Sequence, residues 1–246
     1  MSNETLPTSS NSSTSAYSPP QYVVRTGVMR TLSVMAGNRR YDYGDRIVTR
    51  TDRGTEFGVV LCEATPATIV QIEESIGGRI VRPMTAEDET TWQDQQSRTV
   101  ADAQLCSRLV KELGLVMQVV DVERLLGGER IIFFFLADKR VDFRVLVRHL
   151  AAQLQTRIEM RQIGVRDEAK LLADYGDCGK PVCCNTHLNK MPPVSMRMAK
   201  LQKATLDPSK ISGRCGRLKC CLRYEFDTYE ELQQQMPPVG SRIVTP

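Results

Sequence analysis

The sequence has few of the residues on which most enzymes depend. It contains two histidines among 246 residues, with no Ser/His/Asp arrangement and no glycine-rich nucleotide motif. Its longest apolar run is the seven residues 131–137, too short to cross a bilayer. Residues 1–20 have neither a basic start nor an apolar run, so no secretory signal is expected. We therefore expect a cytoplasmic protein that is not an enzyme and does not insert into membranes.

Cysteine, in contrast, is present in an ordered pattern. Six of the eight cysteines fall in two copies of the phrase C-G-K/R-x-x-C-C, at residues 178–184 and 215–221. Core packing does not require a duplicated pattern of a scarce and reactive side chain, so the pattern indicates chemistry on sulfur. Because thiols stay reduced in the cytosol, metal or cluster ligation is favoured over a disulfide framework.

The spacing predicts one shared site. Adjacent cysteines on a helix point about 100° apart and seldom hold the same ion, so each copy should give its loop cysteine and one of its vicinal pair. We expect Pro181 to open a helix whose N-terminal dipole, with Lys180 or Arg217, lowers the thiol pKa values. The two remaining thiols would bind a second centre, bridge to a partner or pack. The candidate ligands are Cys178, Cys183, Cys184, Cys215, Cys220 and Cys221.

Four interpretations of these thiols remain open: an iron–sulfur cluster, structural zinc, thiol redox chemistry and inert packing. Six thiolates with basic neighbours fit an iron–sulfur cluster. Zinc accepts a C-x4-C spacing, although vicinal cysteines are atypical of its sites. His187 is an alternative ligand, but its position suits a neighbouring helix or loop residue better. Cys62, at a strand end, and Cys106, in a helix, are expected in the core.

Positive charge is concentrated around the second cysteine copy. Residues 187–223 contain nine Lys and Arg against one acid, Asp207, a local charge of +8 in a chain of formal charge +4. Such a segment suits RNA or an acidic protein face, or it offsets the charge of a thiolate site. The candidate nucleic-acid or partner-binding residues are Lys180, Arg197, Lys200, Lys203, Lys210, Arg214, Arg217 and Lys219.

The patterning predicts an α+β fold in four segments. Residues 1–20, rich in Ser, Thr, Asn and Pro, should be a disordered tail. Residues 21–84 have the strand pattern of a small antiparallel β sheet or barrel, with a turn at 51–55. Residues 85–165 show the order α-β-β-α-β, which predicts a sheet with helices packed on one face. Residues 166–246 form a cysteine-rich helical C-terminal region.

Individual elements of this order are marked by local signals. A capping box at Thr85 begins a long helix that Gly114 ends, and the apolar residues 131–136 should form a central strand. Asp142 should cap the next helix. Short helices are expected at about 195–203, 217–224 and 228–235. Residues 240–245 repeat the pattern of 44–49 and predict a strand whose hairpin partner would lie past Pro246.

Several longer phrases resemble a known family. These are R-Q-I-G-V-R-D-E-A-K at 161–170, P-V-S-M-R-M-A-K at 193–200, K-I-S-G-R-C-G-R-L-K-C-C at 210–221, the first cysteine copy and V-D-F-R at 141–144. Together they are similar to the YaaT/RicT proteins, which carry the polymerase-suppressor (PSP) C-terminal domain. The resemblance covers about residues 22–246.

The resemblance implies a non-enzymatic adaptor. Family members join two small helical proteins in a Ric-type complex that carries iron–sulfur clusters, of which a 4Fe–4S cluster is the expected form. That complex associates with ribonuclease Y and influences mRNA processing and, in spore formers, phosphorelay signalling. Ligand status carries over to all six motif cysteines. A zinc-stabilised RNA-binding module and a thiol-redox enzyme are the alternative functions.

Overall fold

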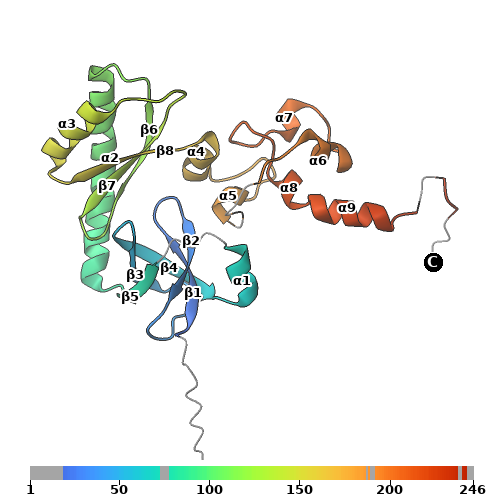
Figure 1. Ribbon diagram of the computed structural model, residues 1–246, viewed down its shortest axis with the longest axis horizontal. Helices are drawn as coiled ribbons and strands as arrows, with labels where there is room; N and C mark the ends of the chain where they lie inside the picture. Colours follow the sequence, from blue (N-terminus) through green and yellow to red (C-terminus); the bar gives the residue numbers. More distant parts are fainter. Residues whose placement is uncertain (1–18, 73–77, 187, 189–191, 238–239, 243–246) are drawn as a thin grey trace, which may run out of the picture.

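The computed structural model describes residues 19–72, 78–186, 188, 192–237 and 240–242. They form a β barrel, a sheet covered by two helices, and a cysteine-rich arm that ends in a projecting helix (Figure 1). Nearly all of the tail predicted at 1–20 lies outside the described residues. Within them, no helix combines the length and the apolar character that a membrane span requires.

The barrel is closed, with the strand order β1-β2-β5-β3-β4. Inward-facing side chains fill the interior, as expected for a small barrel, and the buried residues include Tyr22, Met35, Ile47 and Val60. The predicted barrel is confirmed, but closure uses a parallel pairing between Ala36 and Arg79. Its strands are β1 (Gln21–Thr26), β2 (Thr31–Ala36), β3 (Arg46–Thr51), β4 (Thr55–Glu63) and β5 (Gly78–Pro83).

Two details of the barrel differ from prediction. A short helix, α1 (Pro66–Gln71), interrupts the region read as continuous β structure, and Thr65 and Thr68 form a capping box at its start. Cys62 is exposed, so its assignment to the core was wrong. The reason is that the last two residues of β4 extend past the buried part of the barrel wall.

The next unit has the predicted order α-β-β-α-β. The long helix begins with the predicted capping box, in which the hydroxyl of Thr85 accepts the N–H of Asp88 and the Asp88 carboxylate accepts the N–H of Thr85. The predicted apolar strand is the central strand of the three-stranded sheet. The last strand of the sheet pairs with this central strand in parallel. The elements are α2 (Ala86–Glu112), β6 (Gln118–Arg124), β7 (Arg130–Leu136), α3 (Arg144–Leu154) and β8 (Arg157–Gln162).

Both faces of this sheet are covered. Helices α2 and α3 pack on the face that presents Phe133, with Cys106 fully buried among them as predicted. On the opposite face Phe134 packs with Met29, from the turn between β1 and β2, and with Leu171. The helix α3 starts one residue later than predicted, because Phe143 is its N-cap and Asp142 instead accepts the N–H of Arg144 from outside the helix.

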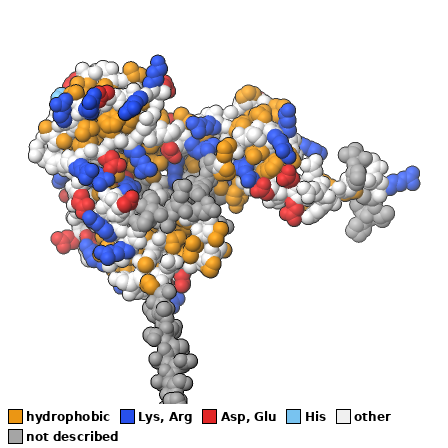
Figure 2. Space-filling view, in the orientation of Figure 1, with side chains coloured by type: hydrophobic (Ala, Val, Ile, Leu, Met, Phe, Trp, Pro, Cys, Tyr) orange, Lys and Arg blue, Asp and Glu red, His pale blue; other side chains and the backbone are white. Residues whose placement is uncertain are grey.

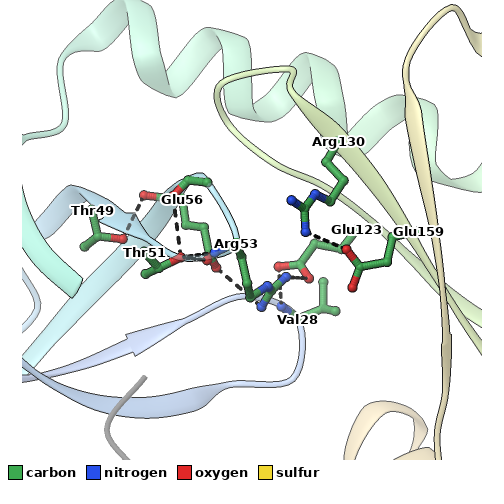
Figure 3. A network of polar contacts seen from close by, with 9 residues as sticks. Val28, Thr49, Thr51, Arg53, Glu56, Glu123, Arg130 and Glu159 are labelled. Carbon is green, nitrogen blue, oxygen red and sulfur yellow. Dashed lines mark hydrogen bonds and ion pairs between the residues drawn. The ribbon is translucent and has the colours of Figure 1, made fainter. Parts of the chain in front are cut away.

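A buried ion network joins the barrel to the sheet (Figure 3). Arg53, in the turn after β3, contacts Glu123 of β6, and its second terminal nitrogen lies 3.4 Å from Glu56. Glu123 also accepts the N–H of Val28 at 3.2 Å. Burial outweighs the attraction to Arg53 and raises the pKa of Glu123. The barrel is therefore held against the sheet through groups that solvent barely reaches.

The remaining elements are short. Two of the three predicted helices are confirmed near their positions, but the helix expected at 217–224 begins only at Cys221, and α7 was not predicted. Of the predicted final strand, 240–242 are described and are not strand, and 243–246 lie outside the described residues. The helices are α4 (Val165–Leu172), α5 (Cys183–Thr186), α6 (Met196–Leu201), α7 (Pro208–Ile211), α8 (Cys221–Tyr224) and α9 (Phe226–Gln235).

Candidate metal centre

The two cysteine phrases fold into two copies of one turn. An antiparallel bridge closes each copy, between Tyr175 and Pro181 in the first and between Ser212 and Leu218 in the second. Matching residues are separated by 37 positions throughout. The repeat seen in the sequence is therefore also a repeat of backbone structure.

The glycine after the first cysteine is required by the turn. Gly179 has a φ of 75° and Gly216 a φ of 71°, in the left-handed region that L-residues with a Cβ seldom adopt. Their N–H groups donate to the carbonyls of Gly176 and Gly213 at 3.0 and 2.9 Å. The repeated Cys-Gly pair thus reverses the chain just after the loop cysteine.

The vicinal cysteines stand at the openings of two four-residue helices. Cys183 and Cys184 begin α5, whereas Cys220 is the N-cap of α8 and Cys221 its first residue. Pro181 was predicted to open the first of these helices. It lies before α5 instead and forms the bridge with Tyr175. The two copies therefore present their vicinal thiols in similar but not identical backbone positions.

All six motif cysteines line one cavity of about 190 Å³. The thiol of Cys183 lies within hydrogen-bonding reach of its counterpart Cys220, and the charge on Cys221 also raises its pKa. In the same way, the charge on Cys220 raises the pKa of Cys184. The vicinal thiols of the two copies therefore interact with one another in the cavity.

The expected lowering of the thiol pKa values was wrong. Burial and the neighbouring Cys220 raise the pKa of Cys183 to about 11, and burial likewise raises those of Cys184 and Cys221. Four-residue helices supply little dipole to oppose this. The positive charge of Lys170, in α4, partly opposes the rise in the pKa of Cys184. The sequence did not single out this lysine.

Ion pairs hold the two copies together. The Asp177 carboxylate of the first copy lies 3.1 Å from Nζ of Lys219 and 3.8 Å from Nε of Arg214 in the second. The same Arg214 nitrogen donates to the carbonyl of Tyr175 at 3.1 Å. Two of the predicted partner-binding cations are therefore engaged within the chain.

Other cations of the basic segment also meet acids outside it. Arg197 lies 3.5 Å from Glu230, and Arg223 lies 2.9 Å from Asp227, both acids of α9. Figure 2 shows acidic, basic and hydrophobic side chains intermingled on the visible face of this arm. The local charge of +8 is thus partly neutralised. The predicted residues left exposed, without an ion pair in the described part of the chain, are Lys180, Lys200, Lys203, Lys210 and Arg217.

The donors fit a soft metal by their chemistry. Thiolate sulfur is the ligand of iron–sulfur clusters and of structural zinc, and mutual repulsion between close thiolates is what a cation relieves. Among the described residues, however, no three Cys, His, Asp or Glu side chains already form a metal-binding group. His187, the alternative ligand, lies outside those residues.

Comparisons with known proteins agree with the resemblance seen in the sequence. The PSP1 C-terminal conserved region matches residues 78–163, and the third domain of PSP1-like proteins matches 193–236. Stage 0 sporulation protein YaaT of Bacillus subtilis (strain 168) is 42% identical over 199 residues, which cover 81% of this chain and 72% of that relative. No solved structure matches. The chain belongs to the YaaT/RicT family of PSP1 proteins.

Proposed function

We propose that this protein is a regulatory adaptor whose cysteine-rich arm holds an iron–sulfur cluster. The observation that carries the proposal is the convergence of both cysteine copies on one cavity lined by six thiols. Because these thiols raise one another's pKa values, they favour either protons or a bound cation in that cavity. The regulatory part is supported by the name of the relative, a stage 0 sporulation protein.

The repeated backbone turn favours a symmetric set of four ligands, two from each copy. Cys183 and Cys220 interact with each other, and the loop cysteines Cys178 and Cys215 hold matched positions in the two copies. A 4Fe–4S cluster bound there would supply a redox-sensitive and oxygen-sensitive centre. Cys184 and Cys221 then remain for a second centre, a partner or packing.

The raised thiol pKa values argue against a thiol-redox enzyme. Disulfide exchange needs a thiolate, and a thiol with a pKa of about 11 at Cys183 is almost fully protonated at neutral pH. The same cavity would accept zinc, so metal identity separates the adaptor from a zinc-stabilised RNA-binding module. In the adaptor, the chain's own residues position the thiols around one cavity.

The proposed partners follow the family resemblance. They are small helical proteins in a Ric-type complex and, through it, ribonuclease Y, with effects on mRNA processing and, in spore formers, on phosphorelay signalling. Location in the cytoplasm is part of the same proposal. Direct RNA binding would use the exposed cations, among them Lys200, Lys203 and Lys210, and would weaken as salt rises.

Anaerobic purification of the full chain tests the proposal. We expect brown protein with broad absorbance near 400 nm and with iron and acid-labile sulfide in equal amounts. Cys215→Ser should lose that iron while circular dichroism still reports the folded barrel. Colourless protein with stoichiometric zinc would replace the cluster by the zinc module. Unchanged iron in Cys215→Ser would contradict a site shared by the two copies.

A further inference from the structure

A second cavity, of about 390 Å³, lies between the barrel and the sheet. Its walls come from β1, β4, α2 and the turn between β6 and β7, so the packing of the two units creates it. The volume falls within the range of sites that take small organic ligands. One turn of an α-helix with its side chains already fills about 400 Å³, so the cavity suits a small molecule better than a segment of another protein. The cavity shares no lining residue with the cysteine site.

Three polar side chains that line this cavity have no hydrogen-bond or ion-pair partner in the part of the chain that the structure describes. They are Arg25 of β1, Arg30 of the turn between β1 and β2, and Gln96 of α2. Arg25 and Gln96 are half-buried, and Arg30 is exposed. A half-buried guanidinium has lost part of its water, and without an acceptor that loss is not compensated. Arg25 and Arg30, the arginine pair, therefore offer N–H donors to a molecule in the cavity.

The other charged side chains of the cavity are already paired within the chain. Glu56 and Glu123 belong to its lining, but both contact Arg53, and their side chains are only 2% and 6% exposed. Arg124 also lines the cavity, and a carboxylate of α2 lies 2.6 Å from its Nε. The charge that a molecule in the cavity would meet is therefore positive, and it comes from the arginine pair.

The turn that carries Arg30 is fixed by its contacts with the sheet. Gly27 has a φ of 67°, and a Cβ at this position would lie 2.6 Å from Oε1 of Glu123, so the backbone packs directly against β6. The N–H of Val28 donates to the same carboxylate at 3.2 Å, and Met29 is buried against the sheet. Within the turn, the N–H of Arg30 donates to the carbonyl of Gly27 at 3.0 Å. A ligand that binds here orders little additional backbone, which lowers the entropic cost of binding.

From these features together we propose that the cavity binds a small organic phosphate. The phosphate would contact the arginine pair, because planar guanidinium groups match its oxygens with paired N–H donors. A phosphate monoester offers three terminal oxygens to two guanidinium groups, whereas a carboxylate offers two. The organic part would lie against the apolar lining residues Val59, Leu125 and Leu126, within reach of the Gln96 amide. The proposal is independent of any metal at the cysteine site.

Titration of the full chain with ribose 5-phosphate tests the proposal. Trp92 lines the cavity and is the only tryptophan in the chain, so its fluorescence reports on this site. We expect a saturable fluorescence change with a midpoint below ~1 mM, and calorimetry should give the same midpoint. Ribose, which lacks the phosphate, should bind at least tenfold more weakly.

Charge-removing variants locate the bound phosphate. The paired change Arg25→Gln and Arg30→Gln should weaken binding at least tenfold. Arg98→Gln is the matched control, because it removes an exposed arginine of α2 that does not line the cavity. If the double variant does not fold, Arg30→Gln alone removes an exposed charge and should still weaken binding.

Three outcomes would overturn the proposal. The first is the absence of both heat and fluorescence change up to ~1 mM ribose 5-phosphate. The second is equal binding of ribose, since the phosphate would then not be recognised. The third is binding that Arg98→Gln weakens as much as the change of the arginine pair does, since affinity would then follow the net charge of the protein and not this cavity.

Discussion

Asp177 and Arg214 occupy matching positions in the two cysteine copies, carry opposite charges and face each other, with Oδ1 and Nε 3.8 Å apart. Because these matching positions lie close together, like charges at both of them would repel. The charge difference therefore favours pairing of the first copy with the second. It disfavours pairing of either copy with its equivalent in another molecule, where two aspartates or two arginines would meet.

Asp177→Asn should weaken the contact between the copies. The carboxylate attracts both Lys219 and Arg214, but all three side chains are partly exposed, so the effect should be modest. We expect roughly threefold faster loss of iron to a chelator, measured anaerobically by absorbance. Asp174→Asn, an exposed neighbour without an ion pair in the described residues, is the control and should lose iron at the normal rate.

Cys183→Ser and Cys184→Ser should differ although the residues are adjacent. Cys183 lies within hydrogen-bonding reach of Cys220, so its loss should abolish most of the bound iron. Cys184→Ser should keep the iron of the purified chain. Iron and sulfide content per chain decide between the two. Equal iron loss in both variants would contradict the symmetric set of four ligands.

Arg53→Met should destabilise the protein strongly. Glu56 and Glu123 are buried around Arg53, and removing the shared cation leaves two carboxylates without compensation. Removal of one partner from a buried ion network costs about 3–5 kcal/mol. Urea unfolding of wild type and variant measures the difference. Arg50→Met, which removes an exposed partner of Glu129 at 2.6 Å, should cost less than about 1 kcal/mol.

Glu123 should make stability depend on pH. Burial raises its pKa in the folded protein above the ordinary value of 4.5, so the folded state keeps a proton that the unfolded state releases. The contribution of Glu123 is therefore complete below pH 4.5 and is lost as pH rises through the raised pKa. Relative to wild type, Glu123→Gln should gain stability as pH rises from 4.5 to the raised pKa, and the gain should stay constant above it.

Urea unfolding at several pH values measures this difference. Glu63→Gln, which changes an exposed carboxylate at the end of β4, should follow the wild-type dependence. A difference between wild type and Glu123→Gln that stays constant from acid to neutral pH would show that Glu123 keeps its ordinary pKa.

Local signals predicted much of the fold. The capping box at Thr85 and the apolar strand at 131–136 are confirmed because each is determined by residues close together in the chain. The parallel closure of the barrel by Ala36 and Arg79 was not predicted, since strand pairing across such a distance leaves no local pattern. Cys62 was misassigned because strand alternation does not reveal where a strand leaves the barrel wall.

For the candidate site, the sequence indicated the donors but not their surroundings. The duplicated phrase identified the six thiols that line one cavity. Lys170 was missed because it acts from a helix outside both copies, and the partners of Arg197 and Arg214 were missed because Glu230 and Asp177 lie outside the basic segment. The tertiary structure determines which charged groups pair, and the local composition of the sequence does not identify these pairs.

The cysteine-rich arm has a small apolar core of its own, in which Ala199, Ile211 and Leu222 are the buried residues. So little apolar area cannot by itself offset the entropy of ordering the arm, so the contacts around the cysteines must supply the rest. If an inorganic centre is lost to an oxidant, the arm should unfold while the barrel and sheet persist. The surface available for binding other proteins would then depend on the redox state of the cell.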